Sequence, residues 1–511
     1  MYNAFPRAFL RLLLGAAFAF APLSHAIAQS ECKYTPISKL PLRYSGPRLV
    51  ITTQGSINGT PAELMVDTGT SATKLTRTGT ERRGIRLYAT GNYARGRGGA
   101  LPIYVSTVNE FIVGPVRAGR SSMPVVLSMY NTPSHDAIIG ASALLQADME
   151  ISLAEKHLLF FAPKKCASTH LAYWSKDALG VPMRRHDIDN MNPKFLVRIN
   201  GVELEAAIDT GSAVSTMSID AAKRSGIALD GPNVTRSGDI VGAGSYSTSL
   251  LIAKARFQIG EETVENAQIG IENPRWNGAD VTLGADFLRA HRVLFATSQN
   301  KLYFSYIGGE PFRERHKIEP WMIAEAEAGN ADAQLAISRA YRRGEFGVPD
   351  KNKASDWLEK AAISGSADAN LSTGVQLLAN RDYAIAAVRL RYALDRLPAE
   401  RDGALWLYLA RVRVGQADLA KSELDAIFAR TESGEWPKPI GEFYLGKLSA
   451  EKLLAEASGG RSDGKERLCE ALAAMGDFHR AHRQPEKEQA IETQIKASCT
   501  TPELTYRKLG G

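Results

Sequence analysis

The chain contains an internal duplication that limits the folds open to its first part. Residues 59–70, with the sequence GTPAELMVDTGT, correspond to residues 201–212, GVELEAAIDTGS. Both segments lead from an Asn-Gly pair through an apolar run into Asp-Thr-Gly. Further along, residues 138–140 (Ile-Ile-Gly) correspond to residues 282–284 (Thr-Leu-Gly), and the offset between copies stays between 142 and 144 residues. A repeat that keeps its register over so long a stretch indicates two copies of one folding unit.

The texture of the sequence changes near residue 315. Before it, short runs of Val, Ile, Leu and Thr are broken by turn residues, and Asn58-Gly59 and Asn200-Gly201 predict hairpin turns. After it, Ala, Leu, Glu, Lys and Arg follow helical spacing, and a Gly-x-Ala-Asp-Ala pattern recurs 36 residues apart at 329–333 and 365–369. We therefore predict a multidomain chain, with an all-β, double-lobed region followed by an all-α helical-repeat domain. The expected boundaries are 33–166 and 180–310 for the lobes and 318–502 for the repeats.

The first residues have the composition of a secretory signal peptide. Arg7 and Arg11 precede an apolar run at 12–21, and Ala26-Ile27-Ala28 forms a small-x-small cleavage site. We predict a signal peptide over residues 1–28, cleaved after Ala28, and a periplasmic or secreted protein. The alternative is an uncleaved anchor, but the apolar run is short for a bilayer span. We expect no stable membrane anchor.

The four cysteines are interpreted in the light of export. An even count in an oxidising compartment indicates disulfides, and four cysteines allow three pairings. We favour Cys32 with Cys166 and Cys469 with Cys499, because each pair brackets one coherent segment. No Cys or His lies at metal-ligand spacing, so we expect neither a metal nor a cofactor. The formal charge of +7 is mild for 511 residues and indicates a solvated basic surface, so we expect no nucleic-acid partner.

Two Asp-Thr-Gly triplets carry the candidate chemistry. A single triplet would mean little, because Asp and Gly are common where strands end, but Asp67 and Asp209 lie in register within the duplication. Two carboxylates held close together share one proton. The ionised member can then activate a water molecule, while the protonated member polarises a scissile carbonyl. The residues expected to support the two loops are Thr68, Gly69, Thr70, Thr210, Gly211 and Ser212.

Each supporting residue type has a physical role in such a pair of loops. The glycines permit tight turns and bring backbone N–H groups close to the carboxylates. The hydroxyls of Thr68 and Thr210 can join the two loops by hydrogen bonds, and those of Thr70 and Ser212 can reach the outer carboxylate oxygens.

The paired triplets, each followed by an apolar-apolar-Gly segment, resemble the aspartic proteases, and the short lobes resemble the retropepsin-like bacterial families more than full-sized pepsins. The resemblance covers roughly residues 45–306. It implies Asp67 and Asp209 as the catalytic dyad, with residues 138–140 and 281–284 as the strands beneath the two loops. It also implies a Gly-rich flap, for which the candidates are Gly98 and Gly99 in the first lobe and Gly242 and Gly244 in the second. Plain hairpin turns are the alternative for both.

The helical region has resemblances of its own. Residues 325–362 resemble a Sel1-like repeat, and the segment beyond them resembles tetratricopeptide helix pairs. Such solenoids present a surface to peptides or protein partners. The alternative is a helical domain that only stabilises the protease lobes.

Together these features predict an exported aspartic endopeptidase that acts on a protein or peptide substrate, with helical repeats that bind the substrate or a partner. The alternative is a catalytically inactive adaptor that uses a protease fold to bind peptides. We expect a monomer, because both lobes lie in one chain and supply the two-fold arrangement within it. Pairing of each lobe with its copy in a second chain is the alternative.

Overall fold

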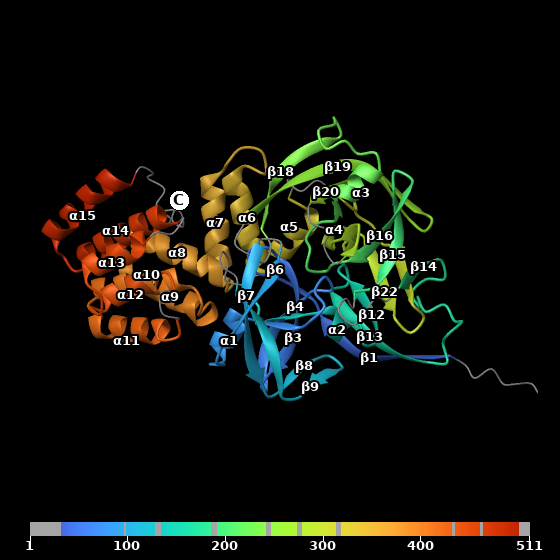
Figure 1. The fold of residues 1–511 in the computed structure, drawn as a ribbon, viewed down its shortest axis with the longest axis horizontal. Coiled ribbons are helices and arrows are strands. Elements are labelled where there is room, and N and C mark those ends of the chain that lie inside the picture. Colours follow the sequence, from blue (N-terminus) through green and yellow to red (C-terminus); the bar gives the residue numbers. More distant parts are fainter. Residues whose placement is uncertain are drawn as a thin grey trace, which may run out of the picture.

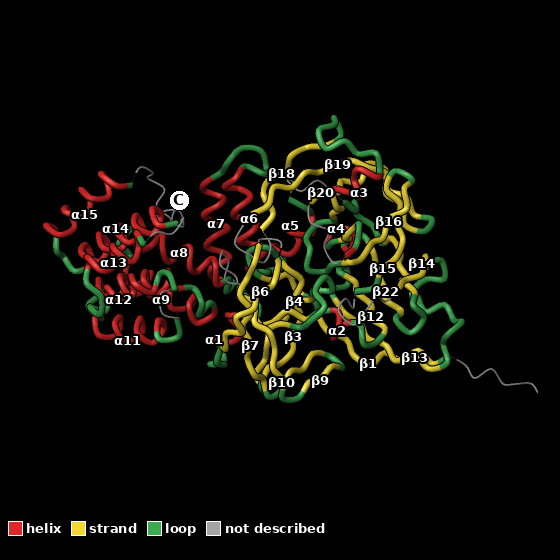
Figure 2. The backbone as a smooth tube through the Cα atoms, viewed as in Figure 1, coloured by secondary structure: helices red, strands yellow, loops and turns green. Residues whose placement is uncertain are grey.

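A computed structural model describes residues 32–96, 99–127, 134–184, 192–241, 247–272, 278–312, 318–431, 435–459 and 463–499. The predicted signal peptide and the flap candidates Gly98, Gly242 and Gly244 lie outside these residues. A region built mainly of strands is followed by a helical region, as the sequence predicts (Figure 1, Figure 2).

The first lobe is a twisted sheet in the order β6-β7-β10-β5-β11-β4-β3-β8-β9, with β2 paired to β3. At the β3–β4 turn, Asn58 and Gly59 both have positive φ, as a two-residue hairpin requires. Two short helices, α1 and α2, complete the lobe. The elements are β2 (Arg43–Ser45), β3 (Val50–Ile57), β4 (Thr60–Val66), β5 (Lys74–Thr76), α1 (Arg77–Arg82), β6 (Tyr88–Gly96), β7 (Gly99–Val108), β8 (Phe111–Val113), β9 (Val116–Ala118), β10 (Ser121–Val126), β11 (Ala137–Ile139) and α2 (Ala141–Leu144).

The second lobe repeats this arrangement. Its strands run in the order β15-β16-β21-β17-β20-β19-β18, and β15 also pairs with β19. In β15 the side chains of Phe195, Val197 and Ile199 are buried at every second position, the alternation expected of a strand with one face on a core. The elements are β15 (Lys194–Ile199), β16 (Val202–Ile208), β17 (Thr216–Ser218), α3 (Ile219–Arg224), β18 (Val234–Val241), β19 (Ser247–Ile259), β20 (Glu262–Glu272), β21 (Val281–Leu283) and α4 (Ala285–Leu288).

The sheet of the second lobe continues, through the pairing of β15 with β14, into a section that both lobes share. Its order is β1-β13-β12-β22-β23-β14, and the two duplicated hairpins meet where β12 pairs with β22. Main-chain hydrogen bonds therefore cross from one copy of the duplication to the other. The strands are β1 (Lys33–Pro41), β12 (Asp148–Ser152), β13 (His157–Lys164), β14 (Leu179–Arg184), β22 (His291–Ala296) and β23 (Lys301–Tyr306).

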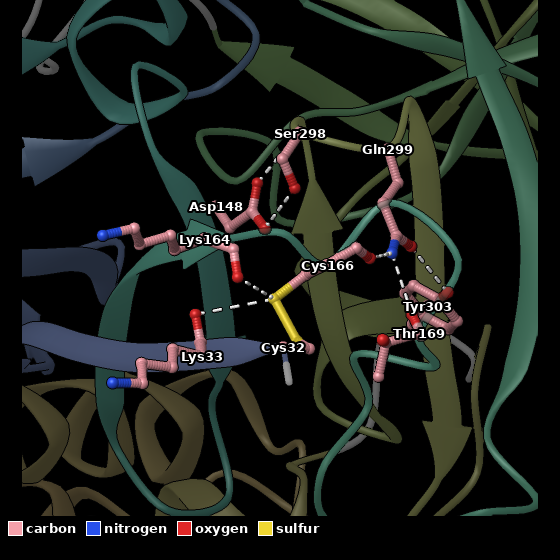
Figure 3. The surroundings of a disulfide bond; sticks show 9 residues. All are labelled: Cys32, Lys33, Asp148, Lys164, Cys166, Thr169, Ser298, Gln299 and Tyr303. Carbon is pink, nitrogen blue, oxygen red and sulfur yellow. Dashed lines mark hydrogen bonds between the residues drawn. A yellow bond between two sulfur atoms is a disulfide. The ribbon is translucent and has the colours of Figure 1, made fainter. Parts of the chain in front are cut away.

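Both disulfides have the expected pairing, Cys32 with Cys166 and Cys469 with Cys499. The first fastens the start of β1 to the segment after β13, at the edge of the shared sheet (Figure 3). Next to it, the side-chain amide of Gln299 donates hydrogen bonds to the carbonyls of Cys166 and Thr169, at 2.6 and 2.8 Å. The turn between β22 and β23 thus holds the connection between the lobes.

The helical region consists of consecutive helices that each contact the next along the chain. Both copies of the Gly-x-Ala-Asp-Ala pattern begin a helix, with Asn330 capping α6 and Ser366 capping α8. The helices are α5 (Pro320–Glu327), α6 (Ala331–Arg343), α7 (Lys351–Ile363), α8 (Ala367–Ala379), α9 (Tyr383–Arg396), α10 (Arg401–Arg413), α11 (Ala417–Phe428), α12 (Lys438–Tyr444), α13 (Ala450–Ser458), α14 (Gly464–Ala481) and α15 (Pro485–Ser498). Their assignment to Sel1 or tetratricopeptide repeats stays a prediction.

The helical region packs directly against the β-lobes. Ala326, Ala333 and Ile337 of α5 and α6 belong to the same hydrophobic core as the β-lobes, and the ring of Trp321 packs on Tyr44 with centroids 4.4 Å apart. Within the described ranges, no helix combines the length and the apolar character needed to cross a bilayer.

Candidate active site

The two candidate aspartates follow equivalent strands. β4 ends at Val66 and β16 ends at Ile208, one residue before Asp67 and Asp209. A parallel strand lies beside each, β11 next to β4 and β21 next to β16. The N–H of Asp67 donates to the carbonyl of Ile139 at 3.1 Å, and that of Asp209 to Leu283 at 2.8 Å. The strands predicted to lie beneath the loops therefore hold the backbone of both aspartates.

The two loops are joined by a reciprocal set of threonine hydrogen bonds. The hydroxyl of Thr68 donates to the carbonyl of Ile208 at 2.6 Å and accepts from the N–H of Thr210 at 3.2 Å. The hydroxyl of Thr210 donates to the carbonyl of Val66 at 2.7 Å and accepts from the N–H of Thr68 at 3.0 Å. Both threonines are buried. These four bonds fix the loops of the two lobes against each other with two-fold symmetry.

Each glycine of the triplets lies against the aspartate of the other lobe. A β-carbon built on Gly69 would lie 2.3 Å from Cγ of Asp209, and one on Gly211 would lie 2.6 Å from Cγ of Asp67. Each glycine N–H also donates to Oδ1 of the aspartate in its own loop, at 2.9 Å in both lobes. The glycines are required here because two carboxyl groups and two loops meet in a space without room for a methyl group.

The glycines after β11 and β21 are required for the same reason. A β-carbon on Gly140 would lie 2.7 Å from the carbonyl oxygen of Ser71, and one on Gly284 would lie 2.6 Å from that of Val214. At either distance the backbone of the loop or of the strand would have to move to make room for a β-carbon. The apolar-apolar-Gly segments therefore mark the places where each Asp-Thr-Gly loop crosses closely over the strand that supports it.

The electrostatics of the pair favour a shared proton. Asp209 is buried and Asp67 keeps partial contact with solvent. Burial, the negative charge of Asp209 and a hydrogen bond between the two carboxyl groups all raise the pKa of Asp67 above its ordinary value. The N–H of Gly69 and the charge of Lys74 act in the opposite direction but do not outweigh them. Carboxyl groups coupled in this way titrate as a pair.

Thr70 and Ser212 occupy equivalent positions at the ends of the loops. Their N–H groups donate to the carbonyls of Asp67 and Asp209, at 3.4 and 3.1 Å, and close each turn. The hydroxyl of Ser212 donates to the carbonyl of Val214 at 2.9 Å. That bond shows Ser212 supporting the shape of its own loop, and contact of either hydroxyl with an outer carboxylate oxygen stays a prediction.

The flap candidates fall on equivalent hairpins. Gly99 begins β7 and pairs with Gly96 at the end of β6, so it lies at the tip of the β6–β7 hairpin. In the second lobe β18 pairs with β19 from Val241 to Ser247, and Gly242 and Gly244 fall in the connection between them, outside the described residues. The sequence therefore placed all four candidates at or between the ends of matching strands, and their role as flaps stays a prediction.

The structure adds a second duplicated feature that the sequence analysis missed. The carboxylate of Asp136 accepts from the N–H of Glu63 at 2.9 Å and from Arg82 at 2.8 Å. In the second lobe Asp280 accepts from the N–H of Glu205 at 3.3 Å and pairs with Arg224 at 2.6 Å. Glu63 and Glu205 lie on β4 and β16, the strands that end at the dyad.

A sequence signal for these residues exists. An Asp stands four residues before both Gly140 and Gly284, at the same offset as the glycines, and an Arg lies 15 residues after each catalytic-loop aspartate. In the first lobe, burial alone would raise the pKa of Asp136, but the hydrogen bond from Arg83 and the charges of Arg82 and Arg83 outweigh burial and hold that pKa below its ordinary value. Asp136 is therefore an ionised anchor for the strand that carries Asp67.

Two segments of the chain match family models of proteases. Residues 53–143 match the model described as "Aspartyl protease", and residues 195–290 match the one described as "gag-polyprotein putative aspartyl protease". The first segment contains Asp67 and Gly140, and the second contains Asp209 and Gly284. The matches support a retropepsin-like protease, and a peptide hydrolase activity in general, for the two lobes.

Whole-chain comparisons add little to this. No curated protein matches the chain significantly. A solved structure titled "Crystal structure of edgp" aligns with 54% of this chain and 96% of its own, at 11% sequence identity and a TM-score of 0.30, which is too low a similarity to support an argument.

Proposed function

We propose that this protein is an exported aspartic endopeptidase, in which Asp67 and Asp209 together activate a water molecule that attacks a peptide bond. The observation that carries the proposal is the reciprocal bonding of Thr68 and Thr210, which faces the two Asp-Thr-Gly loops against each other. The close approach of Gly69 to Asp209 and of Gly211 to Asp67 supports it, because it brings both carboxyl groups to the same point between the lobes.

The chemistry follows from the shared proton. One carboxylate accepts a proton from the bound water, so that the oxygen can attack the carbonyl carbon of the substrate. The other carboxyl group donates a hydrogen bond to the carbonyl oxygen and stabilises the charge that develops there. Proton transfer to the leaving amine then breaks the C–N bond and returns the pair to a singly protonated state. The raised pKa of Asp67 is consistent with such a pair, and the roles belong to the pair rather than to either residue.

The rest of the molecule supplies binding functions in this proposal. The β6–β7 and β18–β19 hairpins act as flaps over an extended protein or peptide substrate. The consecutive helices of the C-terminal region offer a surface to the substrate or to a protein partner. The chain works as a monomer, since one chain contains both aspartates. Export rests on the predicted signal peptide and on the two disulfides, which persist in oxidising compartments.

The proposal is tested by digesting a broad peptide library between pH 4 and 7, with and without a statine-type inhibitor. Such inhibitors resemble the tetrahedral intermediate and bind where a dyad can form it. Cleavage that the inhibitor abolishes supports the protease. If the protein binds peptides but cleaves none under any condition, the inactive adaptor is the better description.

A further inference from the structure

The two lobes differ at the helix that follows each Asp-Thr-Gly loop. In the first lobe, α1 has Thr78, Gly79, Thr80 and Glu81 buried, whereas in α3 of the second lobe the buried residues are Ala221 and Ala222. The side chain of Arg224 in α3 is 51% exposed, while that of its counterpart Arg82 in α1 is 23% exposed. The helical domain supplies part of the cover on α1, because Arg401 and Arg430 donate hydrogen bonds to Glu81.

Arg82 connects that domain to the anchor of the catalytic strand. One guanidinium nitrogen donates to Oδ1 of Asp136 at 2.8 Å, and Nε donates to the main-chain carbonyl of Arg396 at 2.9 Å. Arg396 is the last residue of α9, so its carbonyl has no partner within the helix and lies at the negative end of the helix dipole. A guanidinium group suits this position because it can donate to two acceptors at once.

Further contacts hold the same face of α1. The guanidinium of Arg401, at the start of α10, donates to the carboxylate of Glu81 at 2.6 Å, and both side chains are almost fully buried. Arg77 pairs with Glu435, which lies between α11 and α12. Two parts of the helical domain, the α9–α10 corner and the segment between α11 and α12, therefore meet one short helix of the first lobe.

A hydroxyl supports the glycine behind each loop, since Thr73 accepts from the N–H of Gly140 as Ser215 does from that of Gly284, but only the second lobe adds a carboxylate to this support. The carboxylate of Asp286 accepts from the N–H and the hydroxyl of Ser215, at 2.9 and 2.7 Å, and Ser215 in turn accepts from the N–H of Gly284. At the corresponding positions of the first lobe stand Ser142 and Thr73, with no carboxylate. The loop of Asp209 is thus fastened from inside its own lobe, and that of Asp67 has one carboxylate fewer behind it.

We propose that the helical domain holds the Asp67 loop in its working geometry, and that Arg82 is the positioning residue that transmits this support by joining Asp136 to the end of α9. The proposal rests on the proposed function. The carboxylate of Asp136 accepts from the N–H of Glu63 on β4, and its carbonyl accepts from the N–H of Thr76 on β5. Asp136 therefore holds the strands before and after the Asp67 loop, and only this one residue lies between Arg82 and those strands. Displacement of the α9–α10 corner would therefore reach Asp67 before Asp209.

The test compares Arg82→Met with Arg83→Met in the full chain. Arg83 also pairs with Asp136, at 2.9 Å, and donates to carbonyls within its own lobe, so its loss removes more bonds of the first lobe than the loss of Arg82, without touching the contact with Arg396. Two quantities are measured, namely kcat and KM for a cleaved peptide, and amide hydrogen exchange of residues 67–76 and 209–218. The second quantity needs no activity.

The expected result for Arg82→Met is a fall in kcat of about tenfold to a hundredfold, the size that a misplaced catalytic group produces, with KM unchanged. Exchange of residues 67–76 becomes faster while that of 209–218 stays as in the wild type. Equal effects of the two substitutions on kcat and on exchange would overturn the proposal. If the wild type cleaves nothing, the proposed function fails, and the exchange comparison still decides whether the helical domain supports the loop.

Discussion

The two lobes agree at the dyad and differ around it. Thr68 and Thr210 make the same bonds, Gly69 and Gly211 approach the opposite aspartate, and Asp136 and Asp280 anchor the same strands. Around this core, α1 is covered by the helical domain while α3 is partly exposed. The comparison teaches that the duplicated residues bring the two carboxyl groups together, whereas residues 396–435 of the helical region contact α1 of the first lobe.

Apart from the two aspartates themselves, the largest expected effect falls on the symmetric core. Gly69→Ala and Gly211→Ala would each place a methyl group within 2.6 Å of the opposite carboxyl carbon, so the two carboxyl groups must move apart. We expect a loss of kcat of at least about a hundredfold for both. Gly119→Ala, at a glycine whose φ is not positive and whose surroundings are open, is the control for a general glycine effect. If peptide hydrolysis is impaired in only one of these two variants, the two glycines are not equivalent and the symmetric account is wrong.

The threonine bonds between the lobes come next. Thr68→Val and Thr210→Val each leave a buried carbonyl and a buried N–H without their partner, at a cost of about 4 kcal/mol in the free energy of unfolding. Thr68→Ser keeps the hydroxyl and should lose far less. Urea unfolding monitored by fluorescence gives these values. Unequal losses in the free energy of unfolding for the two Val variants would show that the two threonines do not stabilise the interface between the lobes equally.

The different surroundings of α1 and α3 predict that an arginine substitution costs more stability at α1 than at α3. Arg401→Met leaves Glu81 buried with Arg77 as its remaining partner, and we expect a loss of about 3 kcal/mol. Arg224→Met removes an ion pair whose arginine is half exposed, and should cost less than about 1 kcal/mol. Thermal unfolding of both variants measures the contrast. Similar losses of stability in the two variants would mean that the contacts of the helical domain with α1 do not stabilise the first lobe.

The smallest effect concerns the pH profile. The charge of Lys74 lowers the pKa of Asp67, so Lys74→Met should raise that pKa and move the limb of the kcat profile that Asp67 governs to higher pH, by less than about one pH unit. Lys74→Arg keeps the charge and is the control. The second lobe has Thr216 at this position, so the effect belongs to the first lobe. A shift of the profile to lower pH in Lys74→Met would contradict the effect assigned to the charge of Lys74.

What the sequence could predict follows the same division. The dyad, its supporting strands and the Asn-Gly hairpins were predictable because each appears twice in register. The anchors Asp136 and Asp280 carried the same signal, but a single charged residue before an apolar run is easily read as part of a loop. The contact of Arg82 with Arg396 was not predictable, because 314 residues separate them and neither is repeated in the other lobe as part of such a pair.

The reason for each glycine also needed the structure. The sequence suggests that Gly69 and Gly211 allow a tight turn, but neither is among the glycines with positive φ. Their importance comes from the other lobe, whose carboxyl group fills the space that a side chain would need. Such a constraint depends on how two copies of a motif face each other and is absent from either copy alone.

The most direct measurement of the proposed dyad is peptide hydrolysis by Asp67→Asn and Asp209→Asn between pH 4 and 7, with circular dichroism to show that both remain folded. Asn keeps the shape of the side chain and removes the shared proton. A single site built from both residues predicts that each substitution lowers kcat by at least about a thousandfold. Cleavage at the wild-type rate by either folded variant would contradict it.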